Sequence, residues 1–443
     1  MGRRRNDLRP GISTWPAPPP AVVPAGALPP QPPLPRIKVL HVITRFWAGA
    51  GGNTLLSAVG MDPERYETWV AGCPGGPLWE RAERAGVATV RLRRFREVLS
   101  PIEDLYVLAQ LVRLIRRERF AIVHTHSAKG GFLGRLAAWL CRTPVVVHTF
   151  HGFSVHDFMS RRKRRGYLLL ERAVRRPTHA FFAVSPRVAR EAVELRLAPP
   201  GTVSVVPSAV ELDDGPAQGP GGDLREELGL APETALVGTV GRIDQQKAPL
   251  DFVRMAAVVA RTHPGTRFVM IGEGPLEELV RREADRLGVS VHLTGFRSDA
   301  PRLAAGFDVF VITSLYEGLG RALTEALGSG RPVVATAVNG VPDLVTPGAT
   351  GLLAPAAAPE ALAECVGWML DHPAEARRMG EQGRARVVST FEPARMCELL
   401  DRGYARLLGI PQPQPQRLIA LPPDGVNGHR RHDEEQVVLD LAD

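Results

Sequence analysis

The chain has 443 residues and a net charge of +8, and its composition is 44% hydrophobic but only 6% aromatic. One hydrophobic core seldom serves a chain of this length, so we expect two domains with a cleft between them. The longest apolar runs have the length of strands and fall short of the roughly 18 residues that a membrane-spanning helix requires, so no such helix is expected.

Both ends of the chain differ in composition from its middle. The first 35 residues include APPPAVVPAGALPPQPPLP, which lacks the apolar core of a signal peptide and is too rich in proline for a helix or a central strand. The last part opens with PQPQPQ. The four cysteines lie far apart, so we expect reduced thiols rather than disulfides or a zinc site. We therefore predict a cytoplasmic protein with a disordered arm, 1–35, and a disordered tail, 411–443.

Between these ends, short β-branched runs alternate with longer amphipathic segments. IKVLHVI, AIVHTH and VVVHTF resemble strands, and after the linker ELDDGPAQGPGGD the pattern restarts with ALVGTVGRI, RFVMIG and VFVITS. Such alternation predicts an α/β protein whose parallel sheets are covered by helices on both faces. We predict two Rossmann-like, doubly wound domains that face one another across a cleft. The predicted parts are a first domain at 36–210, a linker at 211–223, a second domain at 224–395 and a C-terminal helix at 396–410.

Two segments of the first domain predict where helices begin. The segment WAGAGGNT follows the strand at 37–43 and predicts a glycine-rich turn over 49–53 before a helix. In SPIEDLYVLAQLVRLIRRERF, Ser100 is the expected N-cap and Pro101 the first helical residue. The helical spacing in this segment predicts an apolar face of Leu105, Leu108, Leu111, Val112 and Ile115.

The positive charge is concentrated in the first half of the chain. Up to Gly215 there are 32 Lys and Arg against 17 Asp and Glu, a net +15, whereas the remainder has 23 against 30, a net −7. The densest run is RRKRR, Arg161–Arg165. An anionic partner such as a phosphate or a membrane surface would explain this run, and so would a solvated helix face. Nucleic acid is disfavoured because the basic residues are not interleaved with aromatic ones.

Two basic residues follow a strand of the second domain. In GTVGRIDQQKAPL the strand ends at Gly241, and Arg242 and Lys247 lie in the short loop after it. Ligands of open α/β sheets bind beyond the carboxyl ends of the strands, where this pair can grip a diphosphate. The chain has no D-x-D motif for a metal, no P-loop and no G-x-G-x-x-G turn. The alternative is a surface Arg and Lys near a helix cap.

Two glutamates flank a glycine break in SLYEGLGRALTEALGSGRPVVAT. If the residues between Glu317 and Glu325 were all helical, the two would lie about 12 Å apart, beyond the roughly 5–9.5 Å of a glycosidase pair. Gly318 and Gly320 instead predict a turn, with a helix that starts near Arg321. The backbone amides between the glutamates would then face a phosphate, and the carboxylates would bind hydroxyl groups at the two ends of the ligand.

Histidines stand at the ends of two strands in the first domain. His124 and His126 lie in HTH, and His148 and His151 lie in HTFHG. A lone histidine at such a place is more often a hydrogen-bonded structural residue, whereas several that converge on one cleft edge favour a role in a site. Because no D-x-D motif or neighbouring cysteine accompanies them, we expect no metal.

In their order along the chain, these motifs resemble those of glycosyltransferase family 4. The set comprises the glycine-rich turn, VHTHSAKGGFLGRLAA, HTFHG, VGRIDQQKAPL, IGEGP, LTGF and the E-x₇-E block followed by GRPVVAT, over roughly residues 36–408. The resemblance implies a retaining, nucleotide-sugar-dependent enzyme of the GT-B fold, without cofactor or metal. THSAKGGFLGR and HTFHG are similar to bacterial members that extend lipid-linked or surface polysaccharide precursors, often from UDP-sugars.

The resemblance also implies roles for individual residues. The expected catalytic residues are His151 near the anomeric centre, Glu317 on the donor sugar, and Arg242 and Lys247 on the diphosphate in place of a metal. Glu325 would bind the ribose. The other donor-binding positions are Gly51, Gly52, Gly241, Gly272, Gly295, Phe296, Gly318, Leu319 and Gly320. The acceptor-side candidates are His124, His126 and Lys129.

Further expectations concern partners and alternatives. The first domain would hold the acceptor, and Arg161–Arg165 would face an anionic membrane on the inner side of the plasma membrane. Asn339 stands where the family frequently has a glycine. One alternative is a GT-B-fold sugar-nucleotide epimerase, which is disfavoured because Arg242, Lys247 and the E-x₇-E block belong together in the transferases. The other is a non-catalytic nucleotide-sugar binding protein.

Overall fold

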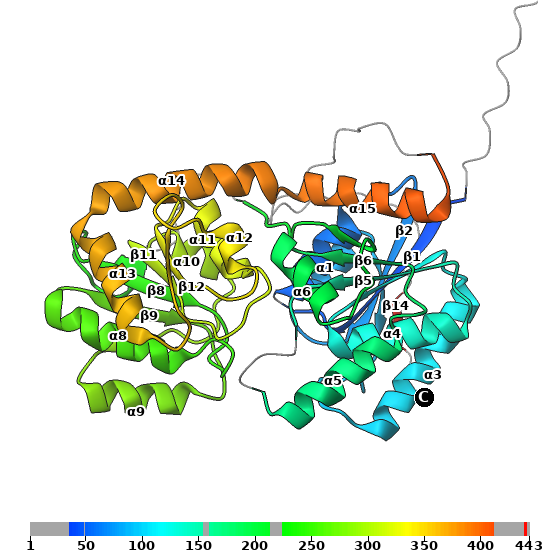
Figure 1. Ribbon diagram of the computed structural model, residues 1–443, viewed down its shortest axis with the longest axis horizontal. Helices are drawn as coiled ribbons and strands as arrows, with labels where there is room; N and C mark the ends of the chain where they lie inside the picture. The colour runs from blue at the N-terminus through cyan, green and yellow to red at the C-terminus, as the bar shows by residue number, and fades with distance from the viewer. Residues whose placement is uncertain (1–34, 48, 154–158, 213–223, 412–437, 441–443) are drawn as a thin grey trace, which may run out of the picture. The chain divides into compact units, whose positions relative to one another are not determined.

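The computed structural model of the protein describes residues 35–47, 49–153, 159–212, 224–411 and 438–440 (Figure 1). The predicted N-terminal arm, most of the predicted linker and most of the predicted tail lie outside the described residues. From residue 36 on, the chain forms one compact unit that contains two parallel sheets.

The first sheet is built mainly by the first half of the chain. Its strand order is β14-β3-β2-β1-β4-β5-β6-β7, and the paired strands run parallel. Strands β4 and β5 are buried throughout, as expected for a parallel sheet covered on both faces. The strands are β1 (Ile37–Arg45), β2 (Tyr66–Cys73), β3 (Ala88–Arg91), β4 (Ile122–His126), β5 (Val145–Phe150), β6 (Ala180–Ala183), β7 (Val203–Val205) and β14 (Val438–Asp440).

The second sheet has the order β10-β9-β8-β11-β12-β13 and is also parallel. Its strands are β8 (Leu236–Val240), β9 (Arg267–Ile271), β10 (Val291–Leu293), β11 (Val309–Ile312), β12 (Val333–Thr336) and β13 (Leu352–Ala354). The prediction of two Rossmann-like, doubly wound domains is therefore confirmed.

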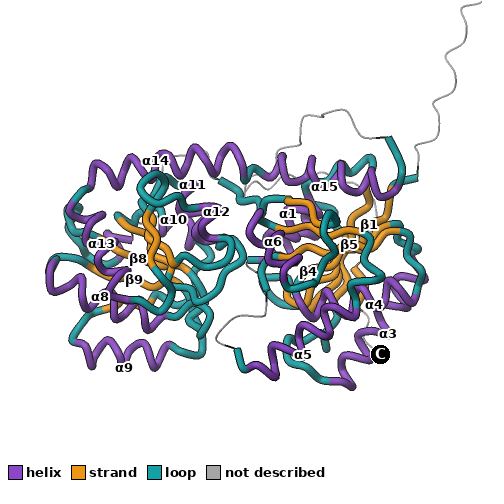
Figure 2. The backbone as a smooth tube through the Cα atoms, in the orientation of Figure 1, coloured by secondary structure: helices purple, strands orange, loops and turns teal. Residues whose placement is uncertain are grey.

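Helices alternate with the strands along the chain and lie around both sheets (Figure 2). None of the described helices is both long enough and apolar enough to cross a bilayer. The helices are α1 (Ala50–Val59), α2 (Leu78–Arg84), α3 (Pro101–Glu118), α4 (Ala128–Leu140), α5 (Arg161–Ala173), α6 (Pro186–Glu194), α7 (Leu224–Glu227), α8 (Pro249–Thr262), α9 (Glu277–Leu287), α10 (Ala300–Ala304), α11 (Arg321–Gly328), α12 (Val341–Leu344), α13 (Pro359–Asp371), α14 (Pro373–Thr390) and α15 (Pro393–Leu408).

Helix α3 begins as predicted, and its predicted apolar face packs into the core except at Leu105. Ser100 is its N-cap and Pro101 its first residue. The buried apolar residues are Val107, Leu111, Leu114 and Ile115, whereas Leu105 itself is 67% exposed. The prediction for Leu105 was wrong because, at about 100° per residue, it lies some 200° around the helix from Val107.

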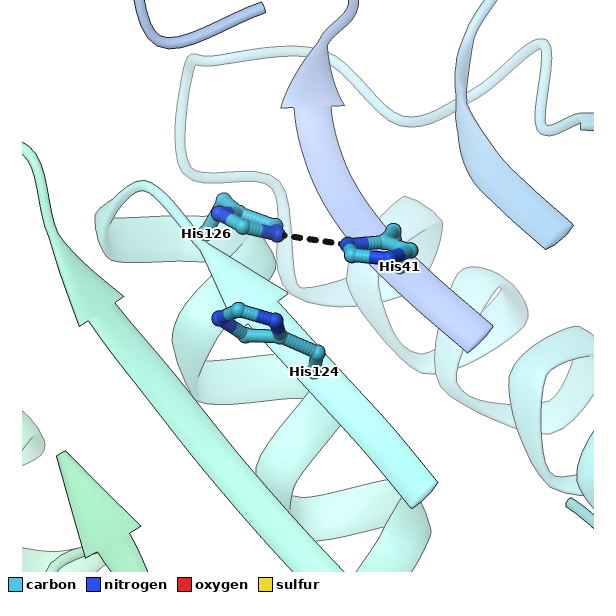
Figure 3. A group of neighbouring side chains, drawn as sticks. All are labelled: His41, His124 and His126. Carbon is cyan, nitrogen blue, oxygen red and sulfur yellow. Dashed lines mark hydrogen bonds between the residues drawn. The ribbon is translucent and has the colours of Figure 1, made fainter. Parts of the chain in front are cut away.

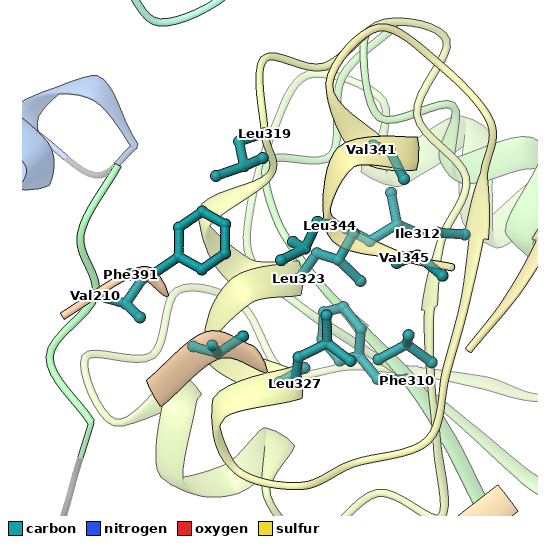
Figure 4. Packing of buried hydrophobic residues seen from close by; sticks show 14 of the residues in the cluster. Val210, Phe310, Ile312, Leu319, Leu323, Leu327, Val341, Leu344, Val345 and Phe391 are labelled. Carbon is teal, nitrogen blue, oxygen red and sulfur yellow. The ribbon is translucent and has the colours of Figure 1, made fainter. Parts of the chain in front are cut away.

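The core of the second domain holds the loop between β11 and α11 in place. Phe310 and Ile312 of β11 pack against Leu323 and Leu327 of α11, and Leu344 of α12 joins the same cluster (Figure 4). A helix fixed in this way along its buried side presents its first turn, and the loop before it, at the carboxyl end of the sheet.

The C-terminal helices connect the two domains. Val387 of α14 belongs to the core of the second domain. Met396, Leu400 and Tyr404 of α15 pack instead with Val39 and other residues of the first domain. The chain therefore returns to the first domain before it ends, and α15 covers that sheet.

The strand order reverses once in each sheet, between β1 and β4 in the first and between β8 and β11 in the second. The connections on either side of such a point run to opposite faces of the sheet, which leaves a crevice where ligands bind in doubly wound folds. The predicted site residues in the loops after β8 and β11, and the histidines of β1 and β4, lie at these two points.

Candidate active site

Glycines meet at the carboxyl ends of β8, β9 and β10. The Gly272 N–H donates to the Gly295 carbonyl at 2.9 Å, and a side chain at Gly272 would meet the Gly241 carbonyl oxygen at 2.0 Å. Gly272 and Gly295 have φ angles of +141° and +72°, in the region that favours glycine. These three predicted donor-binding positions are thus brought together. Phe296, which follows them, is 50% exposed, and its ring lies 6.3 Å from that of Trp47 in the first domain.

The predicted basic pair lies in the loop after β8. The Lys247 ammonium donates to Glu317 Oε2 at 2.5 Å, and the Ser314 hydroxyl donates to the same oxygen at 3.2 Å. Arg242 contacts Asp244 at 3.0 Å. A small pocket lined by Gly241, Arg242, Lys247, Thr313 and Ser314, among others, opens beside them. Both cations are therefore held by carboxylates at the point where the strand order reverses.

The loop from Glu317 to Gly320 has the predicted form. Gly320 caps α11 with φ +90°, and the helix starts at Arg321. This places Glu317 in the loop and Glu325 on the second turn of the helix, while Leu319 is buried. The Glu317 N–H donates to Asn339 Oδ1 at 3.0 Å.

This loop touches the first domain. Gly318 lies so close to the backbone of His151 that a side chain on Gly318 would meet the His151 carbonyl oxygen at 1.7 Å. Asn339 donates to Glu191 of α6 at 3.0 Å, and its φ of +37° lies in the left-handed region that favours glycine. The E-x₇-E loop and the end of β5 therefore form the two sides of one site.

The predicted glycine-rich turn of the first domain is partly a helix. Gly49, with φ +65°, caps α1, and both Gly51 and Gly52 lie in its first turn. The predicted turn over 49–53 was therefore too long, because the helix already begins at Ala50, after a single glycine with positive φ. A side chain at Gly51 would come within 3.1 Å of the Phe46 backbone, and Gly52 lies against Arg321.

Arg321 is a site residue that the sequence analysis missed. Its Nε donates to Glu325 Oε1 at 2.7 Å. Its Nη1 is buried, has no hydrogen-bond partner among the described residues, and would lie 2.2 Å from a side-chain carbon at Gly52. A buried nitrogen without a partner is costly, so this guanidinium is suited to an anionic ligand between the two domains. The position of Arg321 directly after the glycine break was the available signal.

The histidines lie on the opposite side of the site. His41 of β1, His124 and His126 of β4 are completely buried and adjoin one another (Figure 3). The His126 ring is hydrogen-bonded to His41 at 3.0 Å and to half-buried His151 at 2.9 Å. His124 is hydrogen-bonded to the hydroxyls of Tyr404 and Thr149. In this structure His124 and His126 therefore bond to protein groups and lie behind His151, not on an open acceptor surface.

Burial keeps these imidazoles neutral. It lowers the pKa of His41 to about 3 and that of His151 to about 4. The pKa values of His124 and His126 are lowered by burial and further by the neighbouring imidazoles. A set of neutral, mutually bonded rings can orient a ligand but carries no charge to bind one.

Lys129 lies on α4 and fastens a loop. Its ammonium donates to the carbonyls of Arg96 and Val98 at 2.7 and 2.6 Å and pairs with Asp104. Only 9% of its side chain is exposed. The predicted acceptor-side role of Lys129 thus has no support from its contacts, which fix the segment before α3.

Two family models match most of the chain. Residues 55–214 match Glycosyltransferase Family 4, and residues 222–386 match Glycosyl transferases group 1.

Curated relatives cover both domains. The UDP-Gal:alpha-D-GlcNAc-diphosphoundecaprenol alpha-1,3-galactosyltransferase of Escherichia coli is 33% identical over 312 residues, which are 69% of this chain and 80% of that protein. A D-inositol 3-phosphate glycosyltransferase of Segniliparus rotundus is 28% identical over 407 residues, which are 83% of this chain and 89% of that protein.

Solved structures share the fold. Anabaena HepE in complex with UDP and glucose matches with a TM-score of 0.68 at 18% identity, over 84% of this chain and 100% of that one. WaaG, a glycosyltransferase involved in lipopolysaccharide biosynthesis, matches with a TM-score of 0.64 at 17% identity, over 84% and 100%.

Proposed function

Because the chain belongs to glycosyltransferase family 4, we propose that it moves a sugar from a UDP-sugar to a hydroxyl group of a lipid-linked or polysaccharide-precursor acceptor, with retention at the anomeric carbon and without a metal ion. The observation that carries this proposal is the cluster of Arg242, Lys247 and Glu317 at the strand-order reversal of the second sheet, with His151 against the same loop.

The Lys247–Glu317 pair supports a donor-binding step. Each group neutralises the other. A donor diphosphate would take Lys247 as its partner, together with Arg242, and Glu317 would turn to the hydroxyls of the sugar. Lys247 would then exchange one charged partner for another, and Glu317 would exchange its ion-pair partner for neutral hydroxyl donors, so neither charge would be left buried without a partner.

The departure of the diphosphate needs stabilised negative charge. Two cations that are already positioned in the loop after β8 supply it in the way that a metal does in other transferases. The sequence has no D-x-D motif that would hold a metal on the diphosphate, which supports metal independence. In a retaining front-face reaction, the leaving phosphate oxygen takes the proton of the acceptor hydroxyl, so Glu317 need not act as a base.

A UDP-sugar donor and a lipid-linked acceptor are supported by the Escherichia coli relative, whose name specifies both.

A peripheral position on the inner face of the plasma membrane is supported by the surface of the first domain. Helix α5 begins with the basic run Arg161–Arg165, although cations at a helix N-terminus oppose the helix dipole. Large apolar side chains are exposed elsewhere on this domain. They are Val98, Leu99, Ile102 and Leu105 near the start of α3, Trp139 and Leu140 on α4, and Leu169 and Leu170 on α5. Basic and apolar groups together suit an anionic bilayer.

The membrane proposal is tested by sedimentation with anionic liposomes. Wild-type protein should pellet, and a variant with Arg161–Arg165 changed to glutamate should remain in the supernatant. Neutral liposomes are the control, and equal pelleting of the two proteins would contradict the proposal.

The central test offers a panel of UDP-sugars, with undecaprenyl-diphosphate-linked and free sugar acceptors, in the presence and absence of EDTA. Transfer that survives EDTA, with an unchanged anomeric configuration in the product, is the expected result. Isomerised donor without transfer would indicate an epimerase, and binding without turnover would indicate a non-catalytic binding protein.

A further inference from the structure

Three imidazoles from different parts of the first domain form one hydrogen-bonded row. His41 Nδ1 and His126 Nε2 are 3.0 Å apart, and His126 Nδ1 and His151 Nε2 are 2.9 Å apart. Figure 3 shows the first of these bonds, with His41 coming from β1 and His126 from the end of β4. The row ends at His151, directly after β5 and against the E-x₇-E loop.

The two ends of the row have different surroundings. At the inner end, His41 is completely buried, and its Nε2 has no hydrogen-bond partner among the described residues. At the outer end, His151 is half-buried, and the contacts of the described residues leave its Nδ1 for a ligand.

This asymmetry selects one arrangement of the protons. Each neutral imidazole has one N–H, so the bonds of the row must all run in the same direction. If they ran inward, His41 Nε2 would be a buried N–H without an acceptor. If the bonds run outward, His41 Nε2 carries no proton, and only its lone pair is left without a partner. Buried N–H groups without partners are the rarer and costlier case, so the outward direction is favoured.

We propose that His41 and His126 are positioning residues that fix His151 as an Nδ1–H donor facing the reaction site. His41 Nδ1–H donates to His126 Nε2, and His126 Nδ1–H donates to His151 Nε2. His151 Nε2 is then an acceptor, and its only proton is on Nδ1. The ligand group of matching chemistry is an acceptor oxygen of the bound donor, either a sugar hydroxyl or the oxygen that leaves with the diphosphate. This inference rests on the proposed function only for the identity of that ligand.

The row can stay neutral because of its environment. His124 and His148, on the neighbouring strands β4 and β5, adjoin it, and burial lowers the pKa values of both. The charge of Arg135 on α4 is compensated by Glu171 on α5 at 2.5 Å. Tyr404 of α15 is hydrogen-bonded to His124.

Across the cleft, the charged residue beside the His151 contact is Glu317, which is paired with Lys247. The described charged residues named beside the row are therefore paired, Arg135 with Glu171 and Glu317 with Lys247.

The same histidines are close enough to suggest a metal site, since nitrogens of His41, His124 and His126 lie within 4.8 Å of one another. However, both nitrogens of His124 and both of His126 have hydrogen-bond partners. A metal would have to break at least two of these bonds, whereas the row uses them all.

The direct test is the tautomer of His151, measured by long-range proton–nitrogen correlation spectra of histidine-labelled protein, with His151→Gln to assign the signal. Wild-type protein should show the Nδ1–H form. His126→Leu removes the N–H that faces His151 Nε2 and should populate the Nε2–H form. His126→Asn keeps an N–H at the place of Nδ1 and should restore the wild-type form. This readout does not depend on turnover, so it can fail while the proposed function stands.

Kinetics give a second test on the same variants. Burial lowers the pKa of His151 to about 4, and the variants keep most of that burial. An N–H that faces Nε2 disfavours a proton on this atom, so loss of the bond should raise the pKa above this value. The acid limb of the kcat/KM profile should therefore move to higher pH in His126→Leu, with kcat/KM reduced about tenfold at neutral pH. His126→Asn should recover most of this loss.

If His126→Leu does not fold, His41→Leu tests the same row from its far end. The proposal is overturned if wild-type His151 carries its proton on Nε2, or if folded His126→Leu keeps both the tautomer and the pH profile. It is also overturned if elemental analysis finds a metal in wild-type protein that is lost in His124→Leu.

Discussion

The two domains fill the same structural position with opposite chemistry. Where the strand order reverses in the first sheet, neutral histidines are buried and bonded to one another. At the corresponding point in the second sheet, Lys247 and Glu317 form an ion pair that remains partly exposed. Burial explains the difference, because a charge is stable only where solvent or a partner compensates it. The first side is thus neutral, and the second carries a paired positive and negative charge.

The largest effect is expected on the charged side. Lys247→Ala removes one of the two cations that we propose for the diphosphate, and it leaves Glu317 without its ion-pair partner. We expect kcat/KM to fall by about 10³-fold and UDP affinity to weaken, since electrostatic stabilisation of the leaving group is lost. Steady-state kinetics and calorimetry with UDP check this, with the exposed α9 variant Arg282→Ala as control. Unchanged UDP affinity in Lys247→Ala would contradict the assignment of Lys247 to the diphosphate site.

Glu317→Gln should separate turnover from nucleotide binding. The amide keeps the shape of the side chain but loses the charge that Lys247 and the sugar hydroxyls share. We expect kcat to fall by about 10²-fold while UDP affinity changes little. The control is Glu278→Gln on the surface of α9. Near-full activity in Glu317→Gln would contradict the donor-sugar contact.

The buried, neutral histidines of the first domain should affect the free energy of unfolding at low pH. Burial lowers the pKa of His41 to about 3 in the folded protein, whereas in the unfolded chain it is about 6.5. Between these values the unfolded state binds the additional proton, so the free energy of unfolding falls as the pH falls.

His41→Gln should therefore reduce the slope of unfolding free energy against pH by about 1.4 kcal/mol per pH unit between about pH 6 and pH 4. Chemical denaturation at a series of pH values measures this slope. An identical slope in the variant would mean that His41 is protonated in the folded protein.

A smaller effect is expected where the two sides meet. In Gly52→Ala the new methyl group would lie 2.2 Å from Arg321 Nη1 and displace a guanidinium that Glu325 holds. We expect KM for the donor to rise several-fold, by an amount on the order of 1 kcal/mol in binding. Gly166→Ala on α5, where no atom lies within 4 Å, is the matched control and should leave KM unchanged. Equal KM values in both variants would contradict the assignment of Arg321 to the donor site.

Local patterns predicted much of this molecule. Alternating strands and helices indicated two doubly wound domains, because period and composition are properties of short segments. The start of α3 at Pro101 and that of α11 at Arg321 were predicted correctly for the same reason: caps and glycine turns act over a few residues. The E-x₇-E loop therefore took its expected form.

Other features depended on contacts between distant segments. Leu105 and Val107 are equally apolar, and only the packing of α3 on its sheet decided which is buried. His41 lies in an ordinary strand pattern, and its bond to His126 joins positions 85 residues apart.

The sequence by itself determined the class of fold, the positions of the charged residues after β8 and β11, and the family. The tertiary structure alone decided which groups are neutral and which are charged, because desolvation depends on what surrounds a side chain in space. It converted His126 from a candidate acceptor contact into the centre of a buried row, and it placed Arg321 of the second domain against Gly52 of the first.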